Sequence, residues 1–161
     1  MRKRLREFWE KSASQYDEWF SQGLGLRIYR VEREALKKMA ERGEGKLALD
    51  VGCGTGIFSA ILSELGWKVL GVDYSVEMVK RAKGKGLTVA VADACHLPFR
   101  SETFSLVMLF SVLEFLECEA EVLGEVYRVL KPGGSLLLAV HNKANPWNLY
   151  RKLRARWKRV S

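Results

Sequence analysis

Residues 49–59 read LDVGCGTGIFS and place Gly52, Gly54 and Gly56 at alternate positions, directly behind an apolar run that ends in an acid, Asp50. Glycine accepts positive φ and lets backbone N–H groups come close to a ligand. The pattern predicts a strand followed by a ligand-binding loop, with a glycine-rich turn that binds nothing as the alternative. Ile57 stands where the third glycine of a GxGxxG dinucleotide fingerprint would fall, which disfavours a dinucleotide oxidoreductase.

The segments around this loop alternate between short apolar runs and amphipathic stretches. Strands that are apolar throughout are covered on both faces. We therefore expect an α/β fold with a doubly wound, mostly parallel sheet, helices on both faces, and Ser75 as a helix N-cap. The expected strands are 46–51, 67–73, 87–93, 103–111 and 135–141, and the expected helices are 5–20 (whole or broken), 26–42, 55–66, 75–86 and 117–134.

Length and composition are those of one globular domain. The chain has 161 residues, of which 48% are hydrophobic and 29% charged. No apolar run approaches the roughly 20 residues of a membrane span, and the N-terminus lacks the apolar segment of a secretory signal. Cys53, Cys95 and Cys118 form no CxxC pair and are odd in number. We expect reduced thiols in a cytoplasmic protein, and neither a disulfide scaffold nor a zinc site.

The positive charge is concentrated at the C-terminus. Residues 144–161 hold six basic and no acidic side chains, which is +6 of the net charge of +8. Trp147, Tyr150, Leu153 and Trp157 fall roughly along one helical face. This tail is either a surface helix docked by its aromatic residues, or a basic amphipathic helix that contacts an anionic membrane surface, nucleic acid or an acidic substrate.

The motifs, taken together, resemble one family. LDVGCGTG resembles the first motif of class I S-adenosylmethionine-dependent methyltransferases, an acid followed by GxGxG. The segment YDEWF at 16–20 resembles the helical cover of the branch that methylates small molecules. The resemblance spans residues 16–141 and implies the strand order 3-2-1-4-5. Four further segments match in order: GVDYS (71–75), ADACHLPF (92–99), FSLVMLFSVLEF (104–115) and EVYRVLKPGGSLLL (125–138).

The resemblance implies S-adenosyl-L-methionine as cofactor, with S-adenosyl-L-homocysteine as product. A carboxylate has acceptor sites for both vicinal hydroxyls of a ribose, which suits Asp73. Residues 47–67 contain no basic side chain, which disfavours a phosphate-bearing cofactor. The alternative to these ligand contacts is that Asp73 and Asp93 are helix N-caps or turn acids. The resemblance implies that Asp73 binds the ribose hydroxyls, and that Asp93 and the Ala94 amide bind the adenine. Gly52, Gly54 and Gly56 would form the ligand loop, which Asp50 would orient. Ile57, Tyr74 and Leu97 would form apolar walls, and Tyr16 would close over the methionine end.

Methyl transfer from a sulfonium requires alignment and a dry pocket, and a base only when the nucleophile arrives protonated. His141, at the end of the last expected strand, is a weak candidate base and is preferred to His96. Phe115 stands where many relatives have a histidine. The implied activity is methyl transfer to a small-molecule acceptor without a metal. The alternative is a non-catalytic, methyltransferase-like binding module that acts through its basic tail.

The expected organisation is one domain in three parts. Residues 1–45 form an N-terminal helical cover, 46–143 the cofactor-binding α/β core, and 144–161 the basic tail. The family's sheet has seven strands and ends in an antiparallel hairpin, whereas five strands are expected here. The hairpin is therefore missing, which favours a fragment of a longer protein over a natural minimal form, because an exposed strand edge invites pairing.

Overall fold

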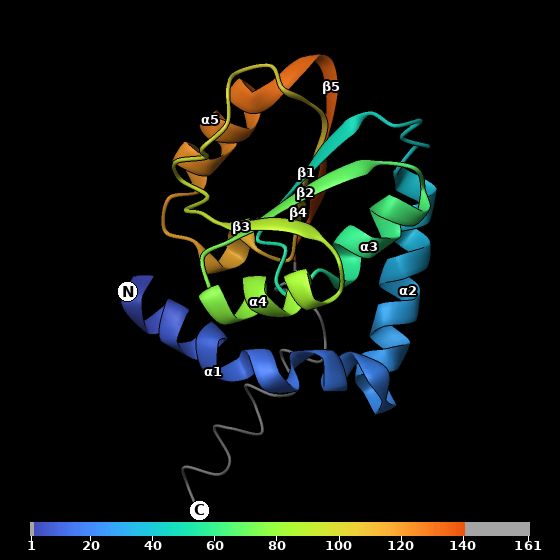
Figure 1. Ribbon diagram of the computed structural model, residues 1–161, viewed down its shortest axis with the longest axis vertical. Coiled ribbons are helices and arrows are strands. Elements are labelled where there is room, and N and C mark those ends of the chain that lie inside the picture. The colour runs from blue at the N-terminus through green and yellow to red at the C-terminus, as the bar shows by residue number, and fades with distance from the viewer. Residues whose placement is uncertain (1, 141–161) are drawn as a thin grey trace, which may run out of the picture.

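A computed structural model describes residues 2–140, so His141 and the basic tail lie outside the described residues. The elements alternate in the order that the sequence predicts (Figure 1). Their bounds are α1 Arg2–Ser21, α2 Gly23–Met39, β1 Leu47–Val51, α3 Ile57–Glu64, β2 Lys68–Asp73, α4 Val76–Gly84, β3 Thr88–Val91, β4 Phe104–Phe110, the 3₁₀ helix η1 Leu113–Phe115, α5 Glu119–Val129 and β5 Leu130–Ala139.

The five strands form one parallel sheet. Their order is β3-β2-β1-β4-β5, and each neighbouring pair is parallel, which confirms the predicted order. The Ser75 hydroxyl accepts the Met78 N–H at 3.2 Å and caps α4, as predicted. The carboxyl ends of the strands therefore share one edge, where the glycine loop follows β1.

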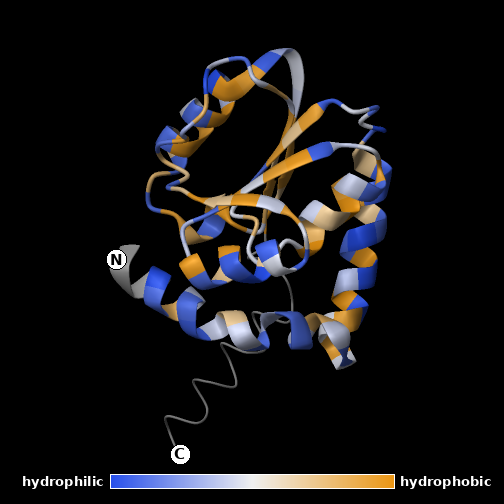
Figure 2. Ribbon diagram, in the orientation of Figure 1, coloured by the Kyte–Doolittle hydropathy of each residue, from blue (hydrophilic) through white to orange (hydrophobic). Residues whose placement is uncertain are grey.

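Helices cover both faces of the sheet. Leu49 and Val51 of β1 belong to the cluster that contains the buried valines of α5, whereas Ala48 packs with Leu36 of α2 and Ile61 of α3. Figure 2 shows the strands as mainly hydrophobic ribbons, with mixed hydropathy along the helices. Burial on both faces is the reason that the strands carry almost no polar alternation.

The last strand begins earlier than the sequence predicts. The pairing of β4 with β5 jumps from Phe104 with Leu130 to Leu106 with Ser135, so residues 131–134 form a bulge within β5. The predicted helix over 117–134 accordingly ends at Val129. Proline and glycine interrupt the ladder without ending the strand, because a bulge accommodates the missing N–H and the positive φ of Gly133.

The prediction of three reduced thiols is wrong. Cys95 and Cys118 form a disulfide with their Cα atoms 6.3 Å apart, and Cys53 is free and buried. The two partners are 23 residues apart in sequence, so their spacing gives no CxxC signal. They meet because the connection after β3 and the start of α5 lie at the same edge of the sheet.

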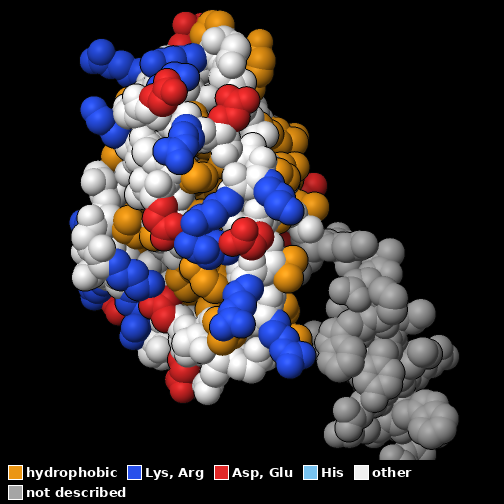
Figure 3. All heavy atoms as spheres, turned by 90° about the vertical axis from the view of Figure 1, so that its right-hand side faces the viewer, with side chains coloured by type: hydrophobic (Ala, Val, Ile, Leu, Met, Phe, Trp, Pro, Cys, Tyr) orange, Lys and Arg blue, Asp and Glu red, His pale blue; other side chains and the backbone are white. Residues whose placement is uncertain are grey.

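Charges of both signs alternate on the face that α2 and α3 present (Figure 3). Glu64 of α3 bonds both Arg33 and Lys37 of α2 at 3.0 Å. None of the described helices combines the length and the apolar composition that crossing a membrane requires.

One buried acid joins the first strand to the helix after the glycine loop. Asp50 of β1 is 2% exposed, and the Ser59 hydroxyl of α3 donates to its Oδ2 at 2.5 Å. Burial raises the pKa of Asp50 to about 7, although the Ser59 hydrogen bond opposes the shift and nearby Asp73 adds to it. The group is therefore held partly protonated at neutral pH.

Asp50 makes stability depend on pH. The pKa of Asp50 in the folded protein, about 7, lies above its ordinary value of 3.8. The folded protein therefore binds the proton more tightly than the unfolded chain, and the stability gained in this way is complete below pH 3.8 and is lost as the pH rises through 7. We expect this group to lower the free energy of unfolding by about 2–3 kcal/mol between pH 5 and pH 8. Asp50→Asn keeps the shape and an acceptor for Ser59 and should remove most of that slope. Denaturant titrations at four pH values measure it; an equal slope in both proteins would contradict the assignment.

Candidate functional site

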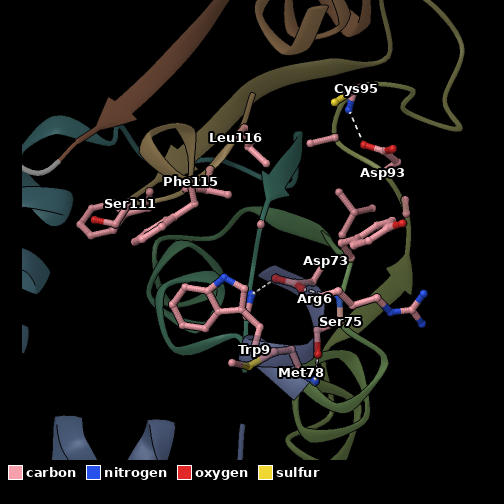
Figure 4. Close-up of a pocket in the computed structure, with 18 of the residues that line it drawn as sticks. Arg6, Trp9, Asp73, Ser75, Met78, Asp93, Cys95, Ser111, Phe115 and Leu116 are labelled. Atoms are coloured by element: carbon pink, nitrogen blue, oxygen red, sulfur yellow. Dashed lines mark hydrogen bonds between the residues drawn. The ribbon is translucent and has the colours of Figure 1, made fainter. Parts of the chain in front are cut away.

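A pocket lies between the carboxyl edge of the sheet and α1. Its walls come from the glycine loop, from the residues that follow β2, β3 and β4, and from α1 (Figure 4). This edge is where open α/β sheets bind ligands. Of the residues singled out in the sequence, Tyr16, Gly52, Gly54, Asp73, Tyr74, Asp93 and Ala94 all line it.

The three glycines of the loop have different neighbours, although all have positive φ. A Cβ on Gly52 would lie 2.4 Å from the Val112 side chain, and one on Gly56 would lie 2.1 Å from Leu87. A Cβ on Gly54 would meet nothing nearer than Tyr16 at 3.9 Å. Close packing against Val112 therefore disfavours a side chain at Gly52, and a Cβ on Gly56 would require the end of the Leu87 side chain to move. Gly54 is the position whose missing side chain leaves open space in the pocket.

Asp73 binds the loop and the start of the next helix. Its Oδ2 accepts the Gly54 N–H at 2.9 Å, and its Oδ1 accepts the Ser75 N–H at 2.8 Å. Burial raises the pKa of Asp73, and the Ser75 and Gly54 amides act in the opposite direction. The carboxylate is thus fixed in place at the pocket wall (Figure 4).

Asp93 lies on the neighbouring wall, after β3. Its Oδ1 accepts the Cys95 N–H at 3.0 Å, and its carbonyl accepts the His96 N–H at 3.0 Å. The acid therefore does have the turn role that the sequence left open. Ala94, between Asp93 and Cys95, also lines the pocket.

Helix α1 is attached across the pocket by two acids. The Glu10 carboxylate accepts the Val76 and Glu77 N–H groups of α4, each at 3.0 Å. Burial would raise the pKa of Glu10, but these amides and Arg6 outweigh it and hold the pKa below its usual value. This position suits a carboxylate, because the first amides of a helix lack partners within the helix.

Asp17 makes the second attachment, two turns further along α1. It accepts the Thr55 hydroxyl of the glycine loop at 2.5 Å and pairs with Lys85 at 2.7 Å. Lys85 also donates to the Thr55 carbonyl at 2.9 Å. Helix α1 is therefore tied both to the loop and to α4, which it crosses beneath in Figure 1.

Aromatic side chains form the wall beside α1. Trp9 stands edge-on to Phe115 at 5.4 Å and to Tyr16 at 6.1 Å between ring centroids. Burial, and then the negative charges of Glu32 and other acids, raise the pKa of Tyr16. At the outer rim, the Arg6 guanidinium lies 5.2 Å from the centroid of the Tyr74 ring. Phe115 thus fills an aromatic position at the site where the sequence lacks a histidine.

Other residues predicted for the site lie elsewhere. His96 is exposed and does not line the pocket, and His141 lies outside the described residues. The Asp50 bond to Ser59 links the two flanks of the glycine loop rather than the loop itself. Those that do not line the pocket are Asp50, Gly56, Ile57, Leu97 and His96.

Sequence reasoning missed the contributions of α1 other than Tyr16. The sequence feature that indicates these contributions is a spacing of seven residues, which is two helical turns. It relates Trp9 to Tyr16 and Glu10 to Asp17, so each pair follows its own stripe of the helix. Within residues 2–140 no group of three or more His, Cys, Asp or Glu side chains is arranged to hold a metal ion.

Comparisons with known proteins identify the family. Residues 49–138 match the methyltransferase domain family, which is more than half of the chain. An uncharacterized protein of Methanocaldococcus jannaschii is 37% identical over 131 residues, covering 81% of this chain and 60% of that protein. A demethylmenaquinone methyltransferase of Thermobifida fusca is 33% identical over 133 residues, covering 78% and 56%. The chain therefore spans about 60% of the length of these curated relatives.

Solved structures give the same result. The crystal structure of a SAM-dependent methyltransferase of Thermotoga maritima, described as a possible histamine N-methyltransferase, has a TM-score of 0.76 and 28% identity. The match covers 91% of this chain and 67% of that one. The residues matched by the family, 49–138, include the glycine loop and Asp73 at the end of β2. This chain belongs to the class I S-adenosylmethionine-dependent methyltransferase family.

Proposed function

We propose that the chain binds S-adenosylmethionine in this pocket and transfers its methyl group to a small-molecule acceptor. The observation that carries the proposal is the position of Asp73, which accepts the Gly54 N–H at 2.9 Å and lines the pocket beside that open glycine. The acid and the loop therefore form one preorganised surface for a nucleoside that bears no phosphate.

The adenosine half of the cofactor fits the walls near β2 and β3. Each Asp73 oxygen accepts one backbone amide and has acceptor capacity left for a ribose hydroxyl. Met78, Ala92 and Leu116 offer apolar contact to a flat ring. Asp93 would accept a hydrogen bond from the exocyclic amine of adenine. The backbone N–H of the neighbouring Ala94 would donate to a ring nitrogen.

The methionine half fits the space over Gly54. A Cβ at this position would lie in the open, so the absent side chain makes room for a ligand. Burial raises the pKa of Tyr16, and nearby acids, Glu32 and Asp73 first among them, add to the shift. The charges of these acids give this end of the pocket a negative potential, which favours a cation. When bound, S-adenosylmethionine supplies an electrophilic methyl group on a positively charged sulfur.

The protein's own part in the reaction is positioning. Trp9, Tyr16 and Phe115 line the pocket with aromatic surface, which favours a dry site in which the acceptor is aligned. The Tyr16 hydroxyl is protonated at neutral pH and can donate a hydrogen bond, and the raised pKa of this group extends that state to higher pH. No histidine among the described residues lines the pocket. This arrangement suits an acceptor whose nucleophile is already unprotonated, with His141 retained as a candidate base.

The three-part organisation into 1–45, 46–143 and 144–161 is part of the same proposal, with the core carrying the cofactor. A cytoplasmic location is proposed as well, although the Cys95–Cys118 bond removes the thiol argument for it. The matched relatives give no support to a non-catalytic binding module.

Asp73→Ala tests the ribose contact. The change removes a charged acceptor, and hydrogen bonds to charged groups contribute about 1.5–3 kcal/mol, so affinity for S-adenosylhomocysteine should fall by about 10- to 150-fold. Calorimetry on folded protein measures it. Glu77→Ala is the matched control, because that carboxylate is exposed on the adjacent helix and pairs with Lys80. Unchanged affinity in Asp73→Ala would remove the ribose assignment.

Gly54→Ala tests the open position in the loop. Gly23 is the matched control, because its φ of +56° is close to the +55° of Gly54 and its Cβ would also meet open space, away from the pocket. Both alanine variants should lose about 1 kcal/mol of stability through backbone strain. Only Gly54→Ala should weaken S-adenosylhomocysteine binding. If both variants bind alike, the glycine serves the turn and not the ligand.

For the basic tail we propose contact with an anionic surface, either lipid headgroups or nucleic acid, on the strength of its six positive charges. Deleting residues 144–161 should abolish co-sedimentation with anionic vesicles at low salt, and added salt should weaken binding of the intact chain. Affinity for S-adenosylhomocysteine should stay the same. Equal pelleting of both forms would show that the tail does not bind these membranes, and an RNA-binding assay then tests nucleic acid.

A further inference from the structure

A covalent bond joins two segments of the pocket wall. Cys95 follows β3, and Cys118 directly precedes α5. Both residues line the pocket, and Figure 4 shows Cys95 beside Asp93. The disulfide therefore connects the wall proposed to hold adenine with the wall formed between β4 and α5.

On the first side of the disulfide, the backbone of Cys95 is hydrogen-bonded to Asp93, the acid proposed to bind adenine. The Cys95 N–H donates to Asp93 Oδ1 at 3.0 Å, so the position of Cys95 sets the orientation of that carboxylate. Ala94, whose amide is the other proposed adenine contact, lies between them. A displacement of Cys95 would thus move both contacts together.

On the second side, the bond is attached to a helix. The Cys118 carbonyl accepts the Val122 N–H at 2.9 Å at the first turn of α5. Leu116 and Glu117, just before it, also line the pocket. The valines of α5 are packed into the core, so this end of the bond is the fixed one.

Further hydrogen bonds hold the chain beyond Cys95 to the same helix. The Leu97 N–H donates to Glu125 at 2.6 Å, and Arg128 donates to the Leu97 and Phe99 carbonyls at 3.0 and 2.7 Å. These contacts do not involve the sulfur atoms. Breaking the disulfide would therefore leave residues 97–99 docked and remove the covalent restraint on residues 93–96, whose own turn hydrogen bonds do not connect them to α5.

We propose that the Cys95–Cys118 disulfide is a redox clasp, meaning a bond that is reversibly reduced and re-formed and thereby sets the affinity of the pocket for its cofactor. The inference rests on the proposed function, since it assumes that adenine binds beside Asp93. With the bond closed, the adenine wall is preorganised and binding orders little. With the bond open, residues 93–96 must be ordered by the ligand, so the cofactor binds more weakly.

The proposed reagent is a dithiol. One of its thiolates attacks a sulfur of the Cys95–Cys118 bond, forms a mixed disulfide and releases the other cysteine as a thiolate. The second thiolate of the reagent then displaces the first cysteine. The protein gains two electrons and two protons, and the reagent leaves as its own disulfide.

Access to the bond is through the pocket. Cys95 and Cys118 are only 3% and 5% exposed, yet both belong to the pocket lining. A bound cofactor would cover them and slow the reagent. Linkage adds an equilibrium effect, because a ligand that prefers the closed form must favour the disulfide by the same factor.

Thiol counting tests whether the bond exists in solution. Protein purified without reductant and then denatured should show one reactive thiol, Cys53, and three after treatment with dithiothreitol. Three thiols before reduction, persisting after exposure to an oxidised dithiol, would overturn the clasp.

Calorimetry tests its effect on the pocket. Affinity for S-adenosylhomocysteine should be about fivefold weaker in the reduced protein than in the oxidised protein, with both folded by circular dichroism. The ligand should also slow reduction by dithiothreitol. The matched control is the double variant Cys95→Ala, Cys118→Ala, whose affinity should not respond to dithiothreitol.

The outcomes separate the two proposals. Equal affinity in oxidised and reduced protein overturns the clasp and leaves the cofactor assignment intact, with the disulfide serving stability. The clasp is also overturned if dithiothreitol weakens S-adenosylhomocysteine binding in the double variant as much as in the original protein, because the loss of affinity then does not depend on the disulfide. Failure of both forms to bind S-adenosylhomocysteine overturns the proposed function itself, whatever the thiol count.

Discussion

Hydrogen bonds that Asp73 accepts join the segments that form the wall of the pocket proposed for the cofactor. One comes from Gly54 at 2.9 Å and the other from Ser75 at 2.8 Å, so a single carboxylate at the end of β2 fixes the glycine loop after β1 and the entry to α4. Burial alone would favour the neutral acid, and the two amides stabilise the charged form. The loop depends on this balance, because a neutral acid would accept the Gly54 and Ser75 amides less strongly, and under the proposed function it would present a donor where the ribose hydroxyls need acceptors.

The sheet could be predicted because its information is local. Apolar runs, glycines and a capping serine specify each strand and helix within a few residues, and parallel order follows from their alternation. The disulfide, the docking of α1 and the bulge in β5 could not be predicted, since each depends on which distant segments meet. Glu10 illustrates the difference: its helix is evident from the sequence, but its bonds to Val76 and Glu77 depend on where α1 crosses α4.

The members of the glycine motif have different surroundings in the structure. Val112 and Leu87 approach the places where side chains on Gly52 and Gly56 would be, although the end of the Leu87 side chain is flexible. Only Gly54 leaves its space open to the pocket. Similarly, Asp50 belongs to the motif but is buried against Ser59, away from the pocket. The spacing therefore reflects both ligand access and close packing of the loop against its neighbours, which the sequence alone does not separate.

Two walls of the pocket are held by interactions of different strength. Helix α1 is attached by the polar contacts of Glu10 and Asp17 and by the packing of Trp9 against Phe115, none of which is covalent. The wall at Asp93 is joined to the segment before α5 by a disulfide, a covalent bond that water and salt do not affect. Under the proposed function, the contacts to adenine therefore belong to the wall that is fixed covalently, and the aromatic cover belongs to the wall that is held by noncovalent contacts alone.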